Sequence, residues 1–258
     1  MDVHNTFLQG DLSKKVYMVL PLGFQWQGEY KGMPESSYDH SLFTKKDGLD
    51  VVIVLVYVDD LLLTGSSMKL IQELKSVLHR HFKMKDLGDL KSFLGIEVLR
   101  SKSGILLTQR KYALELISDS GLGGAKVAST PLEQNVKLTT VDHDEYTGKL
   151  DDPPLKDITG YLRLVGSLLY LTITRPDISF TVQMLSQFMQ QPKASHWEAA
   201  LRLIRYIKRS PGQGLFLSSD SDAQLSAYCD SDWAACPNTT RSVTGYVVKL
   251  GNSLISWK

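Results

Sequence analysis

The stretch LDVVIVLVYVDDLLLT, residues 49–64, constrains the fold more than any other part of the sequence. From Val51 to Val58 it is a nearly continuous run of β-branched and other apolar side chains, which is typical of a buried central strand. Asp59 and Asp60 interrupt the apolar run, and Leu61 begins it again. The pattern therefore predicts two strands joined by a tight turn that carries two adjacent carboxylates.

Composition excludes several classes of protein. At 258 residues, with 43% hydrophobic and 22% charged residues, the chain can bury a core and is not disordered throughout. No apolar run approaches the roughly 20 residues that span a bilayer, and the first ten residues lack the features of a signal peptide. Cys229 and Cys236 cannot form a disulfide framework and lack zinc-site spacing. We expect an intracellular protein, cytoplasmic or nuclear, without a membrane partner.

The remaining chain predicts helices and strands in separate blocks. Apolar spacing predicts a helix over 70–78 that begins after Ser66 or Ser67, a hairpin over 93–108, and a helix over 110–118. A polar connection follows to about Pro154. Three helices come next: one over 158–169, one capped by Asp177, and one capped by Ser195 that ends before Pro211. Strands are then expected at 214–217, 225–229, 245–250 and 253–257.

The Asp59-Asp60 pair admits two interpretations. An exposed hairpin tip is the simpler one, since Asp favours turns. The apolar flanks favour a turn at the mouth of a packed sheet, where carboxylates are natural ligands of Mg²⁺. Successive strand residues point to opposite faces, so a carboxylate from a neighbouring strand is required as well. Asp2 is the candidate.

At this point the sequence resembles a known family. YVDD within its apolar flanks resembles the palm signature of reverse transcriptases, and DVHNTFLQGDLSKKVYMVLPLGF resembles the segment around the first catalytic aspartate of copia-type retrotransposon polyproteins. Further matches follow in the same order: FKMKDLGDLKSFLGIEV, STPLEQNVKL, YLRLVGSLLYLTITRPDISFTVQ and AYCDSDWAACPNTTRSVTGYVVKLGNSLISWK. The resemblance covers nearly the whole chain.

The resemblance implies an RNA-directed DNA polymerase with two Mg²⁺ ions per polymerase site. Asp2 and Asp59 would each bind both ions, and Asp60 would complete the cluster. The implied partners are an RNA or DNA template-primer and deoxynucleotides. Phe7 lies where the family places a steric gate against a ribose 2′-hydroxyl, although an ordinary core role fits it equally well.

The C-terminal segment AYCDSDWA resembles the first strand of a ribonuclease H domain. Asp230 would be its first catalytic, metal-binding carboxylate, whereas Asp232 fits a solvent-facing position. A basic set on the last predicted helix is either a solvated helix face or a contact to nucleic-acid backbone: Arg202, Arg205, Lys208 and Arg209.

Together these features predict an α+β fold. We expect an incomplete palm-like sheet over 1–125, a helical connection or thumb-like segment over 126–212, and the first strands of a ribonuclease H-like α/β domain over 213–258. Only 57 positions separate Asp2 from Asp59, and an SLYGLKQ-like segment of the family is absent from this sequence. We therefore expect a shortened polymerase relative with weak or no activity. The alternatives are a non-catalytic nucleic-acid-binding relic and a chain without function.

Overall fold

The computed structural model describes residues 2–3, 33–34, 36–134, 136–148, 151–220 and 222–258. It divides into two compact units, Met1–Leu90 and Lys91–Lys258. Both units combine helices with antiparallel strands, which confirms the α+β class. The three-part division expected from the sequence stays a prediction.

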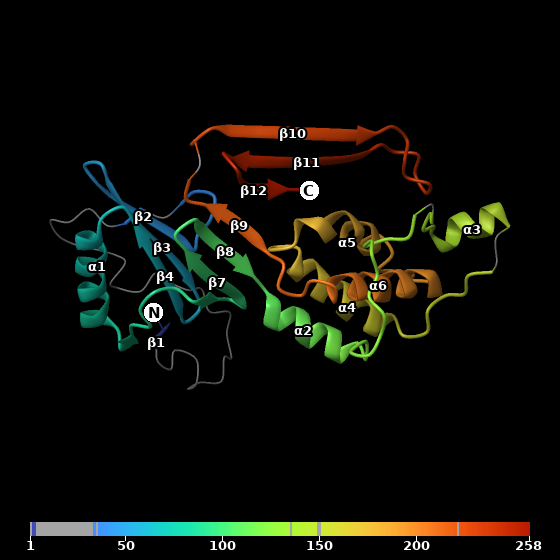
Figure 1. Cartoon of the computed structure of the whole chain (residues 1–258), viewed down its shortest axis with the longest axis horizontal. Coiled ribbons are helices and arrows are strands. Elements are labelled where there is room, and N and C mark those ends of the chain that lie inside the picture. Colours follow the sequence, from blue (N-terminus) through green and yellow to red (C-terminus); the bar gives the residue numbers. More distant parts are fainter. Residues whose placement is uncertain (1, 4–32, 35, 135, 149–150, 221) are drawn as a thin grey trace, which may run out of the picture. The chain divides into compact units, whose positions relative to one another are not determined.

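The described residues of the first unit form a five-stranded antiparallel sheet and one helix. The sheet has the order β2-β3-β4-β1-β5, and in Figure 1 α1 runs beside it. The elements are β1 (Asp2–Val3), β2 (Leu42–Asp47), β3 (Asp50–Tyr57), β4 (Asp60–Gly65), α1 (Met68–His81) and β5 (Met84–Lys85).

Alternation along β3 explains how the sheet packs. Val52 and Val54 are 1% and 0% exposed and pack in clusters with residues of α1, whereas the intervening residues are half-buried among the described residues. The predicted strand is therefore confirmed, and Val52 and Val54 are the buried residues of its inner face. The helix begins after Ser67, one of the two expected caps, although the Ser67 side chain makes no capping hydrogen bond.

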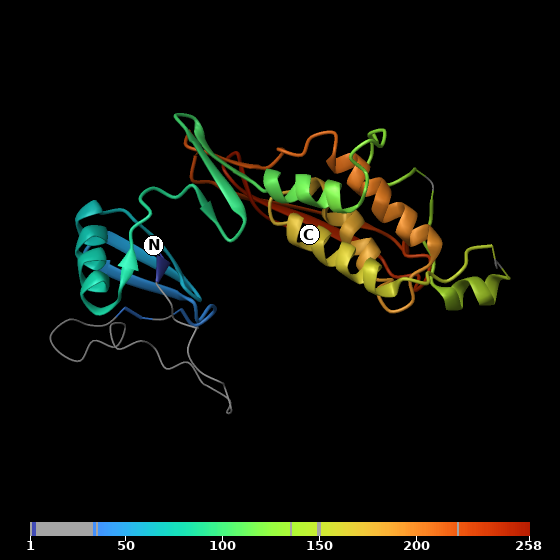
Figure 2. The same ribbon diagram turned by 90° about the horizontal axis from the view of Figure 1, so that it is seen from below.

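The second unit holds a helical bundle and two further sheets. One sheet has the order β6-β7-β8-β9 and the other β10-β11-β12. Figure 2 shows α2, α4 and α6 lying alongside one another. Its strands are β6 (Ser92–Phe93), β7 (Ile96–Ser101), β8 (Gly104–Thr108), β9 (Leu215–Ser218), β10 (Leu225–Asp232), β11 (Val243–Leu250) and β12 (Ser253–Trp257). Its helices are α2 (Arg110–Asp119), α3 (Val141–Thr147), α4 (Ile158–Leu171), the 3₁₀ turn η1 (Pro176–Ile178), α5 (Ser179–Ser186) and α6 (Ala194–Ile207).

The bundle core follows the apolar spacing that predicts its helices. Tyr161, Val165 and Leu168 of α4 are fully buried against Leu203 and Ile207 of α6 in one continuous cluster. Two predicted caps are wrong. Asp177 lies inside η1 and pairs with Arg175, and Ser195 lies in the first turn of α6, which begins after Lys193. The Asp177 side chain is engaged by Arg175, two residues before it, and the Ser195 hydroxyl donates a hydrogen bond to Asp152, 43 residues away, so neither side chain caps a helix.

Two segments differ from the sequence-based expectation. The strand expected to open the C-terminal domain, β9, instead pairs with β8, and Leu217 lies opposite Ile105. The polar connection contains a short helix, α3, which the sequence analysis treats as irregular. Its seven residues include few apolar side chains, so the sequence shows no apolar spacing that would predict a helix. No helix within the described ranges is long and apolar enough to cross a bilayer.

Candidate active site

The candidate site begins at the β3–β4 hairpin. Tyr57 pairs with Asp60 across the two strands, so Val58 and Asp59 form the turn. Asp60 is therefore the first residue of β4 rather than part of the turn, and only Asp59 lies in the turn itself. Asp59 is exposed and Asp60 is half-buried. Val58 has a φ of 54°, a left-handed conformation that is strained for a β-branched residue.

The neighbouring strand β1 carries Asp2, the residue expected to provide the third carboxylate. Asp2 lies opposite Asp60 in the antiparallel register, and on its other side it lies opposite Lys85 of β5. Residues directly opposite each other belong to the same face of a sheet. Leu61, the next residue of β4, is buried in the cluster with Leu78 of α1. Asp60 therefore occupies the face of the sheet away from α1.

This arrangement fits a divalent cation in its donor chemistry. Carboxylate oxygens are the ligands that Mg²⁺ prefers, and it needs only one or two of them when substrate phosphates supply the rest. Among the residues whose side chains are described, no group of three acidic, histidine or cysteine residues is placed to hold a metal ion. The fit therefore rests on the strand register that brings Asp2 beside Asp60.

The end of β5 is tied to α1 by an ion pair. Lys75 Nζ of α1 lies 2.9 Å from Asp86 Oδ2, directly after Lys85. Hydrogen bonds from Lys75 and then from the Gly88 N–H hold the pKa of Asp86 below its usual value.

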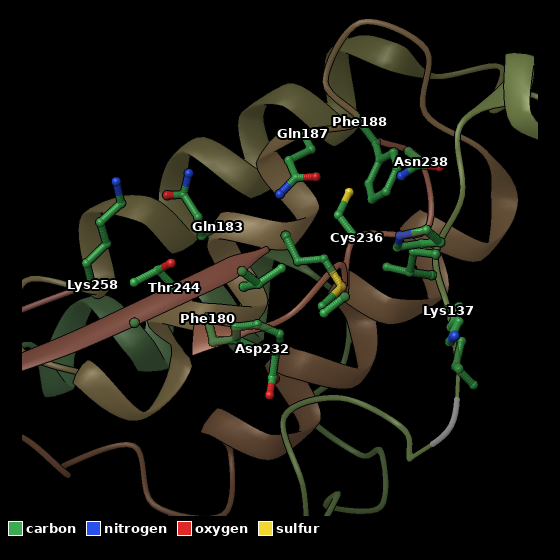
Figure 3. Close-up of a pocket in the computed structure, with 17 residues that line it drawn as sticks. Lys137, Phe180, Gln183, Gln187, Phe188, Asp232, Cys236, Asn238, Thr244 and Lys258 are labelled. Atoms are coloured by element: carbon green, nitrogen blue, oxygen red, sulfur yellow. The ribbon is translucent and has the colours of Figure 1, made fainter. Parts of the chain in front are cut away.

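Two other predicted site residues stand apart from this sheet. Phe7, the expected steric gate, lies outside the described residues. Asp230 lies on β10, where it is exposed and pairs with Gly245 of β11. Asp232 lies two residues further, at the end of the same strand. It is also exposed, as the sequence analysis expects, and it lines a cavity of about 220 Å³ with Phe180 and Cys236 (Figure 3).

Two of the four basic residues predicted to form one face of the last helix make hydrogen bonds within the chain. Lys208 donates hydrogen bonds to the carbonyls of Leu122, Gly123 and Ala125, and Arg202 donates to Thr130 Oγ1. These two cations therefore bind the segment that follows α2. Arg205 is half-buried, and Arg209 is exposed after the end of the helix.

A buried ionic network at the start of α6 has no counterpart in the sequence analysis. Lys193 is 2% exposed and pairs with Asp144 and, at 3.0 Å, with Asp152. Burial raises the pKa of Asp144, but hydrogen bonds from Lys193 and Thr139 outweigh it and leave the pKa below its usual value. No sequence signal finds this network, because its members lie up to 49 residues apart in polar segments without a period.

His196 is fully buried in the same region. Its ring stacks on Phe188 with centroids 3.9 Å apart, Nδ1 accepts a hydrogen bond from the Lys193 N–H, and Nε2 lies 3.1 Å from the Thr139 carbonyl. Burial, followed by the charge of Lys193, lowers the pKa of His196 to about 4. The ring is therefore a neutral packing element.

Comparison with known proteins identifies the family. Residues 30–134 match the model described as reverse transcriptase (RNA-dependent DNA polymerase). The whole chain is 38% identical to the retrovirus-related Pol polyprotein from transposon RE2 of Arabidopsis thaliana. It is 40% identical to an uncharacterised mitochondrial protein of the same plant, over 79% of this chain and 81% of that protein. It is also 30% identical to the putative transposon Ty5-1 protein of Saccharomyces cerevisiae, over 100% of this chain and 91% of that protein. No solved structure shows a significant match.

These matches define a reverse transcriptase-related protein. The chain belongs to the reverse transcriptase family found in copia-type retrotransposon polyproteins, as its sequence predicts. It spans about a fifth of the RE2 polyprotein, namely 19% of its length. The alignment extends over 288 positions against the 258 residues of this chain, so RE2 carries roughly 30 residues in this region that the chain lacks. The expected internal shortening agrees with this difference.

Proposed function

We propose that the first unit is the remainder of a palm-like polymerase sheet and acts in RNA-directed DNA synthesis with weak or no activity. The observation that carries this proposal is the register that places Asp2 opposite Asp60, one residue from Asp59. Two segments far apart in the sequence thereby lie on neighbouring strands of one sheet. Reverse transcriptase relatives imply nucleic acid as the substrate.

The reaction is attack of a primer 3′-hydroxyl on the α-phosphate of a deoxynucleotide, with pyrophosphate leaving. Two Mg²⁺ ions bound at the site would polarise the phosphate and neutralise developing charge. Asp2 and Asp59 would hold the ions, and Asp60 would complete the donor set. The chain's own contribution is positioning, since the sheet fixes the carboxylates before substrate arrives. Phe7 would exclude a ribose 2′-hydroxyl.

Weak activity follows from the missing residues. Catalysis by positioning is lost when the elements that hold the template and nucleotide are incomplete. By the family resemblance, the SLYGLKQ-like segment that this chain lacks would help to hold the incoming nucleotide and the template, and the roughly 30 additional residues of RE2 support such a loss. By the same resemblance, we propose that β10, β11 and β12 are the first strands of a ribonuclease H-like domain, with Asp230 as its first metal-binding carboxylate.

Primer extension on an RNA template with Mg²⁺ tests the polymerase proposal. The wild-type chain is compared with Asp59→Asn and with Asp47→Asn, a matched control at the end of β2, next to the β2–β3 turn of the same sheet. We expect slow extension at high protein concentration that Asp59→Asn abolishes and Asp47→Asn preserves. Extension that survives Asp59→Asn would overturn the site. A folded chain with no extension, but with salt-sensitive template binding that needs no Mg²⁺, would support the nucleic-acid-binding relic instead.

A further inference from the structure

A cavity of about 220 Å³ opens between α5 and the loop that joins β10 to β11, within the second unit (Figure 3). Its lining comes from residues 136–138, from the α5 segment over 180–188, from residues 232–245 of the β10–β11 hairpin, and from Lys258. We infer that this cavity, which we call the Cys236 cavity, binds small apolar electrophiles and that the Cys236 thiol bonds to them covalently. The ligand class is α,β-unsaturated carbonyl compounds that carry a ring or a short alkyl chain. Neither the binding nor the modification depends on the polymerase site proposed for the first unit.

Apolar side chains form most of the cavity wall. Leu138 and Phe188 belong to the bundle core, at 4% and 3% exposure, and Phe180 and Met184 add partly exposed apolar surface. An apolar cavity of about 150 Å³ is large enough to take up benzene. The Cys236 cavity therefore has room for one ring with a short substituent. Transfer of such a ring from water to an apolar wall is favourable, so the cavity concentrates apolar reactants beside the thiol.

The loop around Cys236 holds the thiol in place and favours its reactive form. The Cys236 N–H donates to the Arg241 carbonyl at 3.1 Å, and the Cys236 carbonyl accepts from the Thr240 N–H at 2.8 Å. Burial raises the pKa of the Cys236 thiol, but hydrogen bonds from the Thr239 side chain and from the Thr239 and Asn238 N–H groups outweigh it and leave the pKa below its ordinary value. The thiolate is the nucleophile of cysteine chemistry. The thiol that lines the cavity is therefore suited to attack a bound electrophile.

The reaction is a conjugate addition that balances without an oxidant or a reductant. The thiol proton passes to solvent as the Cys236 thiolate forms. The sulfur then bonds to the β-carbon of the electrophile, and the π bond between the α- and β-carbons breaks. Its electron pair moves onto the carbonyl group as an enolate, and the α-carbon takes a proton from water. The product is a thioether in which S–H has added across the carbon–carbon double bond.

Two maleimides with the same reacting group separate binding in the cavity from the intrinsic reactivity of the thiol. N-benzylmaleimide carries a ring, whereas N-(2-hydroxyethyl)maleimide carries a short polar chain. Cys229, the other cysteine of the chain, is exposed on β10 and lies outside the cavity lining. Cys229→Ser and Cys236→Ser therefore each leave one thiol, whose two rate constants are measured by intact-mass spectrometry. The benzyl-to-hydroxyethyl ratio, compared between the two thiols, cancels any difference in their nucleophilicity.

The expected result is a larger rate ratio at Cys236. We expect the ratio in Cys229→Ser to exceed the ratio in Cys236→Ser roughly tenfold, because part of the ring is buried in the cavity. In urea-unfolded protein the two ratios should be equal. Adding Phe180→Ala to Cys229→Ser removes apolar wall at a position that is 55% exposed, and should lower the ratio roughly threefold. Phe216→Ala, a matched control on β9 that is 44% exposed and outside the lining, should leave the ratio unchanged.

Two results would overturn the inference. Equal ratios at the two cysteines of the folded protein would do so even if Cys236 reacts faster with both reagents, because the thiol would then be activated without a binding cavity. A high ratio that Phe180→Ala leaves unchanged would place the ring outside the Cys236 cavity. If a serine variant does not fold, peptide mass mapping of the wild-type chain gives the rates at both thiols in one molecule, with the same expected difference.

Discussion

Acid should destabilise the second unit through one buried histidine. His196 is fully buried, and its neutral form satisfies both ring nitrogens, since Nδ1 accepts from the Lys193 N–H and Nε2 donates to the Thr139 carbonyl. A proton on Nδ1 would make this atom a donor, and it would then face the Lys193 N–H, which is also a donor. The adjacent Lys193 charge opposes the proton further. Protonation is therefore incompatible with the native packing.

The size of the stability loss follows from the linkage between proton binding and folding. The ring binds a proton near pH 6.5 in the unfolded chain but only near pH 4 in the folded protein. The unfolded chain therefore holds more protons between these values, so the stabilising contribution is complete above pH 6.5 and is lost as the pH falls toward 4. Each unit of pKa difference corresponds to about 1.4 kcal/mol. We expect a loss of about 2 kcal/mol between pH 7.5 and pH 5, and about 3 kcal/mol in full.

Urea unfolding followed by tryptophan fluorescence measures this loss, since three of the four tryptophans, Trp197, Trp233 and Trp257, lie in the second unit. His196→Gln should abolish most of the change between pH 7.5 and pH 5, whereas His79→Gln, an exposed position on α1, should leave it intact. If His196→Gln does not fold, the ring signals of wild-type His196 in an NMR titration should remain those of a neutral imidazole down to about pH 4. The reasoning fails if wild type and His196→Gln lose equal stability, or if the ring titrates near pH 6.5.

Two further predictions concern stability. Lys193→Met leaves the buried Asp144 and the partly buried Asp152 without their cation, and should lower the free energy of unfolding by about 3 kcal/mol. Urea unfolding at pH 7 measures this value, and the exposed control Lys156→Met should leave it nearly unchanged. Equal losses of stability in the two variants would refute the stabilising role of the buried ion pair. Val58→Gly relieves a left-handed φ of 54° at a side chain that is 55% exposed, and should raise the free energy of unfolding by about 1 kcal/mol; a lower urea midpoint than wild type would contradict this.

Local patterns predict the elements that carry their own signal. The apolar run over 51–58 predicts β3, and the spacing of Leu203 and Ile207 predicts the buried face of α6. Both predictions are confirmed because burial of a strand or helix face imposes a period on the residues that form it. The sequence predicts the ends of helices less accurately, as the wrong caps at Asp177 and Ser195 show.

Long-range contacts carry no such signal. The pairing of β9 with β8 joins residues more than 100 positions apart, and the Lys193 network joins side chains from α6 and the polar connection. Arg202 and Lys208 look like a free basic face along the helix, but in the structure they bind the chain after α2. A sequence shows which helix face is charged, but not which other segment that face meets.

For the candidate site, the sequence by itself determined which residues have the right chemistry. Two adjacent aspartates between apolar strands require a third carboxylate, and the family resemblance identifies Asp2. Only the tertiary structure decided that β1 lies between β4 and β5, which places Asp2 opposite both Asp60 and Lys85. The physical reason is that strand order is set by how whole elements share one buried face against α1. The strand order depends on the packing of the whole sheet, so no single residue in the sequence indicates it.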